Sequence, residues 1–438
     1  MSIPSTSVSV TSSAAQTRAA YLSHLLALAQ RSETTLPWLR ELRDHAAVRV
    51  QEQTFPSTRD EEWRFTDLSD LLAVELAEVG GAEVQAAKLA ELAKFYLPEA
   101  DQSRLVFVNG IYAPQLSSLH HLPEGLTIGN LVNLPEAAQQ HLQTYLAKQT
   151  GAEEVFTALN TSGLSDAAVV QVRKNLVVET PIHLLFVSTS SPALIQPRAL
   201  VIAEPNSALT IIEDHVTLNE GVYFTNSVTE IWLGDNAQAN HTRVQRDNLA
   251  AFHIGKTAVS QARTSRYTCT VVNLGAKLAR HHLGIHQTGE QTETTLNGLT
   301  VLHGEQVGDT HSTIALTKPY GTTRQIQKNI VDDRAHAVFN GKVFVPKEAQ
   351  LTDAGQLNRN LLLSSKARVD TKPQLEIVAD NVKCTHGATV GQLETDEVFY
   401  LQSRGIDADS ARKLLVHAFA YEVIESIPLA SLRQHIQL

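Results

Sequence analysis

Two side chains that can bind a soft metal ion lie two positions apart near the end of the chain. Cys384 and His386 belong to the run CTHG at positions 384–387. If this run is a β-strand, both side chains lie on the same face, where a thiolate and an imidazole could approach one metal ion. Each residue also has a structural interpretation. A histidine beside glycine is often a hydrogen-bonded residue, and a free cysteine often packs as a small buried side chain.

The number of nearby ligands limits what this pair can hold. Iron–sulfur clusters and structural zinc sites usually need four ligands. The neighbouring sequence supplies no further cysteine or histidine, and the other cysteine, Cys269, lies far away along the chain. Any cluster that this chain contacts must therefore be completed from outside it.

Patterns that could support catalysis are weaker. Gly255-Lys256-Thr257 resembles the end of a phosphate-binding loop, but Ala250 occupies the position of the first glycine and the residues between are not glycine-rich. Spacing indicates neither a Ser/His/Asp triad nor a pair of catalytic carboxylates. The other histidines examined are expected to be structural: His281, His282, His286, His303 and His311. We therefore predict that the chain is not an enzyme and does not hydrolyse ATP by itself.

The composition is typical of a globular protein that binds neither nucleic acid nor membranes. The chain has 438 residues, 43% hydrophobic and 19% charged, and this length suggests two or three structural units. Its formal net charge of −10 argues against general nucleic-acid binding, which needs a basic surface. No apolar run reaches the ~18 residues that a membrane-spanning helix requires. Two cysteines do not describe a disulfide framework, so we expect a cytoplasmic location.

The first 165 residues are predicted to be mainly helical. Residues 1–13 are rich in serine and threonine and are expected to form a disordered tail. Apolar residues recur at helical spacing over 14–53, and further helices are predicted over 83–95 and 135–148. Between these helices, Asn109-Gly110 separates two β-type runs, which predicts a hairpin. Residues 14–165 therefore form the expected N-terminal domain.

Short β-type runs replace the helical patterns from 166 to 393. The runs are rich in Val, Ile, Leu and Thr, and Asn340-Gly341 predicts a tight turn between two of them. Spacing alone leaves a β-helix, a sandwich or a propeller open, although the unequal intervals suit a β-helix better. A stack of strands has unpaired edges at its ends, so we expect it to dimerise through the stack, with a second copy or with a paralogue.

The last segment, 394–438, returns to helix. A helix over 394–404 is predicted to end at Gly405, and Asp407 or Asp409 is expected to cap a second helix. The second helix carries apolar residues on opposite sides: Leu414, Ala418 and Tyr421 on one, and Val416, Ala420 and Ile424 on the other. We expect the β-stack to cover one side, and another helix or a partner protein to cover the other.

Several segments resemble one known family, in the same order along the chain. They are RDEEWRFTDL (59–68), FNGKVFV (339–345), QLNRNLLLS (356–364), KPQLEI (372–377), ADNVKCTHGATVG (379–391) and GQLETDEVFYLQSRGI (391–406). Together they resemble the SufB/SufD family, the paired non-ATPase subunits of the Suf iron–sulfur cluster assembly machine. The resemblance implies a mainly β fold with flanking α-helices, in which a right-handed parallel β-helix lies between N-terminal and C-terminal helical domains. The scarcity of cysteine and the short helical N-terminus favour the SufD type over SufB.

The resemblance also implies a function and partners for this chain, as a non-catalytic scaffold subunit. A nascent iron–sulfur cluster would form at the interface with a SufB-type paralogue, with His386 as the favoured ligand and Cys384 in a less defined role. The C-terminal helices would dock a SufC-type ABC ATPase, with Leu414, Ala418 and Tyr421 as candidate contacts. No cofactor would be bound permanently, and the isolated chain could form a homodimer. A SufB-type scaffold and a β-helix enzyme that acts on polysaccharides are the alternatives.

Overall fold

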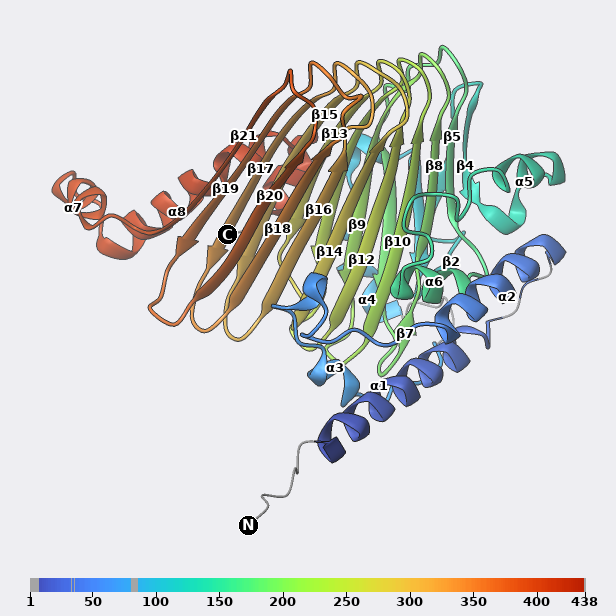
Figure 1. Cartoon of the computed structure of the whole chain (residues 1–438), viewed down its shortest axis with the longest axis horizontal. Coiled ribbons are helices and arrows are strands. Elements are labelled where there is room, and N and C mark those ends of the chain that lie inside the picture. Colours follow the sequence, from blue (N-terminus) through green and yellow to red (C-terminus); the bar gives the residue numbers. More distant parts are fainter. Residues whose placement is uncertain (1–7, 33, 35, 80–85, 437–438) are drawn as a thin grey trace.

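The computed structural model describes residues 8–32, 34, 36–79 and 86–436. Within them, two long and mostly parallel sheets face each other (Figure 1). The first sheet contains, in spatial order, β1 (Ser103–Val108), β6 (Ile182–Ser188), β9 (Ala208–Thr217), β11 (Gln238–Arg246), β13 (Arg266–Asn273), β15 (Glu293–Leu302), β17 (Thr322–Val331), β19 (Asp353–Leu362) and β21 (Lys383–Gln392). The second contains β4 (Leu126–Asn130), β5 (Ala168–Val172), β8 (Arg198–Ala203), β10 (Phe224–Leu233), β12 (Phe252–Gln261), β14 (Leu278–Gln287), β16 (Val307–Ala315), β18 (His336–Val345) and β20 (Arg368–Ile377). Short strands β2 (Ile111–Tyr112) and β3 (Ser118–Leu119) pair with β1, and β7 (Leu194–Ile195) pairs with β10.

The chain alternates between the two sheets from β8 onward, so that two successive strands make one coil of a parallel β-helix. Register partners lie one coil apart in sequence: Arg266 pairs with Glu293, 27 residues later, and Thr322 pairs with Asp353, 31 residues later. Side chains alternate between the lumen and the outer surface of each sheet, because successive residues of a strand point to opposite faces. The predicted mainly β fold with a parallel β-helix core and helices at both ends is confirmed.

One corner of the β-helix repeats a residue in the left-handed backbone conformation. The residues with φ between 55° and 64° at this corner are Asn175, Asn206, Asn236, Thr264, Gln291, Tyr320 and Leu351. Each stacks on the next through a backbone hydrogen bond, as when the N–H of Asn206 donates to the carbonyl of Asp235. Asparagine suits this conformation, and the amide of Asn236 also donates to the amide oxygen of Asn206 at 3.0 Å.

The two Asn-Gly pairs of the sequence have different structures. Asn109-Gly110 forms the predicted hairpin turn between β1 and β2, and both residues have positive φ (53° and 82°). The turn predicted at Asn340-Gly341 is wrong, because both residues lie in the middle of β18. The side chain of Gln356 explains the glycine: a Cβ at Gly341 would lie 2.2 Å from its amide nitrogen.

Most helices of the N-terminal part cover the outer face of the second sheet, whereas Leu92 of the helix over 86–93 packs against the first sheet. The helices of this part are α1 (Val8–Ala29), α2 (Pro37–Gln51), α3 (Ser69–Leu72), α4 (Ala86–Ala93), α5 (Glu136–Leu142) and α6 (Val155–Ser162). Residues of α1, α2 and α6 share an apolar cluster with Phe224, Phe252 and Leu278 of the sheet. Strands β1 and β4 also lie in this part of the chain and join the two sheets, so the β-helix begins before residue 166.

The predicted N-terminal boundaries differ from the structure at several points. Helix α1 begins at Val8, so residues 8–13 of the predicted tail are helical, whereas residues 1–7 lie outside the described residues. The helix predicted over 83–95 is α4, although residues 80–85 lie outside the described residues. The helix predicted over 135–148 is α5, which ends at Leu142.

The segment 59–68 lies as a strap across the outer face of the second sheet. The ring of Trp63 stacks against the guanidinium of Arg280, 4.0 Å away. The hydroxyl of Thr66 donates to the buried carboxylate of Asp309 at 2.5 Å, and Lys372 of β20 pairs with Glu61 at 2.6 Å. The strap therefore connects the N-terminal part to the last coil of the β-helix.

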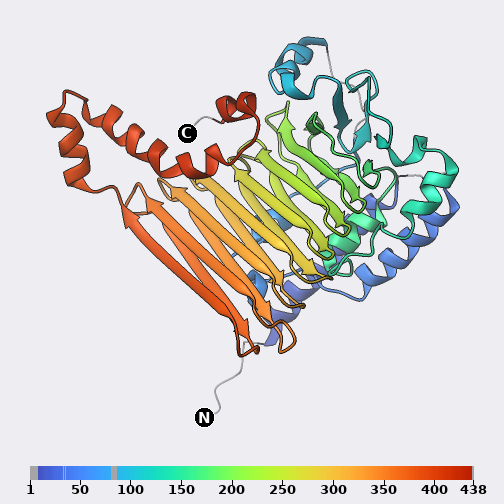
Figure 2. The same ribbon diagram turned by 90° about the horizontal axis from the view of Figure 1, so that it is seen from above.

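The C-terminal helices are α7 (Thr395–Ser403), α8 (Ala408–Glu425) and α9 (Ala430–His435). Helices α8 and α9 pack on the outer face of the first sheet, on the opposite side of the molecule from α1 and α2, whereas α7 projects beyond the end of the β-helix (Figure 2). As predicted, Gly405 follows α7 in the left-handed conformation, and the Asp407 carboxylate caps α8 by accepting from two backbone N–H groups. None of the helices in the described part of the chain is long and apolar enough to span a membrane.

Candidate functional site

Both sheets stop at the same end of the β-helix, at β20 and β21. In the part of the chain that the structure describes, β21 has only β19 as a neighbour and β20 only β18. Residues of these two strands are exposed or half-buried, whereas those of the central strands are mostly buried. Figure 2 shows this open end of the β-helix in orange, away from the helices of the N-terminal part. Its unpaired backbone groups can bind another strand.

Cys384 and His386 lie on β21, at this open end. Their register partners on β19 are Ala354 and Gln356, which are both buried, so the two side chains occupy rows that face the lumen in the preceding coil. His386 is exposed, because no further coil covers it within the described residues. Cys384 is half-buried against the apolar core, and this burial raises the pKa of its thiol. The predicted pair thus shares one face at the end of the β-helix.

The structure does not bring Cys269 to this pair. Cys269 lies in the lumen on β13, and four strand spacings separate β13 from β21 in the sheet, or about 19 Å. In the described residues, no group of three or more histidine, cysteine, aspartate or glutamate side chains is arranged to hold a metal ion.

A second apolar feature lies between α7 and α8. A cleft of about 460 Å³ is lined by Asp396, Glu397, Tyr400, Leu401, Leu414, Leu415 and Ala418. On α8, Ala420, Val423 and Ile424 are buried against the first sheet, whereas Leu414 and Tyr421 are about half exposed. One face of α8 therefore packs on the β-helix as predicted, and the other face, with all three candidate docking residues, is directed outward.

Comparison with known proteins identifies the family. Residues 186–419 match the model of the SufBD core domain of SUF system FeS cluster assembly, and residues 16–184 match the model of the SufBD protein N-terminal region. The chain belongs to the SufB/SufD family.

Relatives of this SufB/SufD-family chain are similar over most of their length. The chain is 50% identical to the iron–sulfur cluster assembly SufBD family protein slr0076 of Synechocystis, over 90% of this chain and 89% of that protein. It is 34% identical to the chloroplastic protein ABCI7 of Arabidopsis thaliana, over 91% of this chain and 85% of that protein. It is 32% identical to the iron–sulfur cluster assembly protein SufD of Escherichia coli, over 87% of each chain. The predicted family is thus confirmed, and the chain is a component of iron–sulfur cluster assembly.

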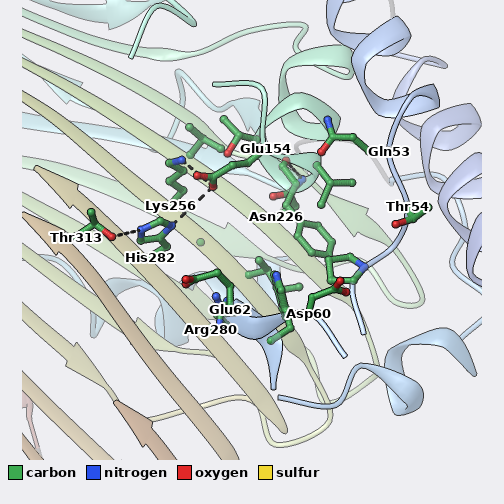
Figure 3. A pocket seen from close by; sticks show the side chains of 18 of the residues that line it. Gln53, Thr54, Asp60, Glu62, Glu154, Asn226, Lys256, Arg280, His282 and Thr313 are labelled. Carbon is green, nitrogen blue, oxygen red and sulfur yellow. Dashed lines mark hydrogen bonds and ion pairs between the residues drawn. The ribbon is translucent and has the colours of Figure 1, made fainter. Parts of the chain in front are cut away.

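A cleft of about 790 Å³ is lined by residues of the strap, of α6 and of the second sheet of this SufB/SufD-family chain (Figure 3). Glu154 lies between Lys256, at 2.8 Å, and His282, at 3.7 Å. Burial alone would raise the pKa of Glu154, but His282 and Lys256 outweigh burial and lower this pKa to about 2. Lys256 lies in the middle of β12, so the sequence that resembled a phosphate-binding loop is a strand.

A network of buried ionisable groups fills part of the lumen and was not predicted from the sequence. The Glu213 carboxylate contacts His215 at 2.8 Å and His241 at 3.1 Å. Burial lowers the pKa of His215 to about 4; it also opposes protonation of His241, but Cys269 and Glu213 outweigh it and raise that pKa to about 9. The sequence signal is a run of consecutive polar residues in β9 (213–215) and β11 (240–243), which must place some of them in the lumen, but such runs also predict a loop.

Proposed function

We propose that this chain is a non-catalytic scaffold subunit that pairs with a SufB-type paralogue through the open end of its β-helix. The observation that carries the proposal is the position of Cys384 and His386 on β21, an exposed strand without a second neighbour in the described part of the chain. Two ligands are fewer than an iron–sulfur cluster usually needs, so a partner that joins this end would supply the others. The nascent cluster is cargo, held at the interface and then passed on.

The same end also favours pairing by strand addition. Strand β21 has unpaired backbone groups along its outer edge. Strand β20 contains Pro373, which cannot donate a backbone hydrogen bond, so we expect β21 to contribute more of the main-chain hydrogen bonds with the paralogue.

We further propose that a SufC-type ABC ATPase docks in the cleft between α7 and α8. The cleft is apolar, and Leu414, Ala418 and Tyr421 are exposed beside or within it. Helix α7 begins at Thr395, three residues after β21 ends at Gln392. A movement of the docked ATPase would therefore be transmitted directly to the strand that carries His386.

Substitution of His386 tests this function. His386→Ala should leave the fold and the complex with both partners intact, because the imidazole is exposed and has no packing role. It should abolish maturation of an iron–sulfur reporter enzyme in cells that depend on the Suf system. His303→Ala, which removes another exposed imidazole from a distant coil, is the matched control and should mature the reporter normally. Normal maturation with His386→Ala would remove this residue from the function.

A further inference from the structure

His386 is the last member of a row of side chains that runs along the lumen wall. Gln325 on β17 pairs in register with Gln356 on β19, and Gln356 pairs with His386 on β21. Neighbouring residues of such a row are one strand spacing apart, about 4.8 Å. The amide of Gln356 is therefore the polar side chain directly behind His386 in this row.

The amide of Gln356 has one bonded and one unbonded end. Its nitrogen donates to the side-chain oxygen of Gln325 at 2.9 Å, towards the interior of the β-helix. Its oxygen Oε1 is buried and has no hydrogen-bond partner among the described residues, although the side chain as a whole is only 4% exposed. Buried acceptors are rarely left without a donor, so this oxygen requires an explanation.

The neighbouring strand is shaped to hold this amide in place. The amide nitrogen of Gln356 occupies the space where a Cβ of Gly341 would lie, and the ring of Phe339 closes the same space. Because its nitrogen is fixed in this way, the amide cannot turn its oxygen inward without losing the bond to Gln325. The unbonded oxygen therefore needs a donor other than Gln325, and the next polar side chain in the row is His386.

We propose that Gln356 is a positioning residue for His386. A rotation of the exposed His386 side chain brings one ring N–H to Oε1, and this hydrogen bond fixes the tautomer and leaves the lone pair of the other ring nitrogen directed to the open end. Histidines that bind metals commonly donate their second N–H to a carbonyl in this manner. The consequence for cluster assembly rests on the proposed function of His386, but the hydrogen bond itself does not.

The same geometry separates the two candidate ligands. The register partner of Cys384 is Ala354, whose side chain has no polar atom, so Cys384 lacks a corresponding neighbour in its row. Of the two side chains at the open end, His386 is therefore the one that the preceding coil can orient by a hydrogen bond.

The tautomer of His386 tests the proposal directly. In protein labelled with ¹⁵N-histidine, the two ring nitrogens of the neutral imidazole report which of them carries the proton, and His386→Ala assigns their signals. We expect one tautomer to predominate in the unsubstituted chain and both to be populated comparably in Gln356→Met.

Gln325→Met is the matched control for structural damage. It removes the acceptor of the same Gln325–Gln356 bond and also two contacts with Ser312, but it leaves Oε1 of Gln356 in place. Because the amide of Gln356 then keeps only its packing against Gly341 and Phe339, the preference for one tautomer should weaken less than in Gln356→Met. An unchanged ratio in Gln356→Met, or an equal change in Gln325→Met, would overturn the proposal.

The cellular assay separates this inference from the proposed function. If the proposal holds, Gln356→Met should reduce reporter maturation about tenfold or more, and Gln325→Met should reduce it less. Loss of maturation in His386→Ala with no tautomer change in Gln356→Met would overturn the positioning role alone. If the tautomer changes in Gln356→Met but His386→Ala matures the reporter normally, the proposed function is wrong, whereas the hydrogen bond between Gln356 and His386 is supported.

Discussion

Gly341 faces the lumen at a point where the side chain of Gln356 already fills the available space. A Cβ there would lie 2.2 Å from the amide nitrogen of Gln356 and 2.6 Å from the ring of Phe339. Protein interiors are packed too closely to absorb such an overlap without movement of the neighbouring groups. This glycine is therefore required for packing, and its conformational freedom is secondary.

Alanine at this position should destabilise the chain measurably. We expect Gly341→Ala to lower the free energy of unfolding by about 1–3 kcal/mol, the usual cost of adding a methyl group to a filled core. Urea denaturation measures the change. Gly391→Ala is the control, because a Cβ at Gly391 would meet no atom within 4 Å, and its stability should change little. A Gly341→Ala variant as stable as the control would contradict this account of the lumen.

The two Asn-Gly pairs also show what local sequence could predict. Both pairs lie between β-type runs, and the hairpin at Asn109-Gly110 was predicted correctly. At Gly341 the deciding contact comes from Gln356, fifteen residues later and on the opposite sheet, and no local pattern contains it. The same limit applies to the site: Cys384 and His386 could be found from their types and spacing, but the residue behind His386 is fixed by register over one coil.

At the level of elements, the repeated corner turn shows how coils of unequal length stay in register. Seven residues at this corner have positive φ, and the first three are Asn175, Asn206 and Asn236. In later coils, Tyr320 and Leu351 take the same conformation. This conformation costs roughly 1–2 kcal/mol for a residue other than glycine, asparagine or aspartate. The stack imposes the conformation, because the N–H of Leu351 must donate to the carbonyl of Asn381 in the next coil.

An asparagine at the last of these positions should stabilise the chain. Leu351 is about half exposed and has few contacts to lose, whereas asparagine tolerates the left-handed conformation well. We therefore expect Leu351→Asn to raise the free energy of unfolding by about 0.5–1 kcal/mol in urea denaturation. Leu351→Ala lacks the short polar side chain whose local hydrogen bonds stabilise asparagine in this conformation, so it should show no comparable gain. A lower stability for Leu351→Asn than for Leu351→Ala would show that the corner is not strained.

The elements could be predicted to different degrees for a physical reason. The C-terminal end of α7 depends on Gly405, and the N-terminal end of α8 depends on the Asp407 carboxylate. Both groups are local in sequence, and both ends were predicted correctly. The choice among β-helix, sandwich and propeller depends on contacts between residues about one coil apart, so the strand runs alone left it open. The strap could not be placed for the same reason, because Thr66 and its partner Asp309 are 243 residues apart.

At the level of the whole molecule, the β-helix keeps several histidines buried and neutral. His183 is completely buried on β6, where burial and the charges of Arg104 and Arg246 lower its pKa to about 3. Burial likewise lowers the pKa of His215 to about 4 and the pKa values of His253 and His281. The unfolded chain binds protons at these histidines below a pKa of about 6.5, whereas the folded chain does not.

Acid should therefore weaken the stability that these histidines contribute, and replacing one of them should reduce this loss. Because the folded pKa of His183 is depressed, its contribution to stability is complete above pH 6.5 and is lost as the pH falls towards 3. Each pH unit below 6.5 costs up to about 1.4 kcal/mol for each such histidine. His183→Leu keeps a similar volume without a titrating group, so it should gain about 2 kcal/mol relative to the unsubstituted chain between pH 6.5 and pH 5.

Urea denaturation at pH 8, 6.5 and 5 measures this gain as a difference between pH values. The difference between pH values isolates the titration, because any packing change from His183→Leu alters the stability equally at all three pH values. His120→Gln provides the control, because it also removes one histidine but at an exposed position, and it should leave the pH profile unchanged. Parallel profiles for His183→Leu and the unsubstituted chain would mean that His183 takes up its proton in the folded state. The Asp214 carboxylate, 3.9 Å from this imidazole, would then be the group that stabilises the charge.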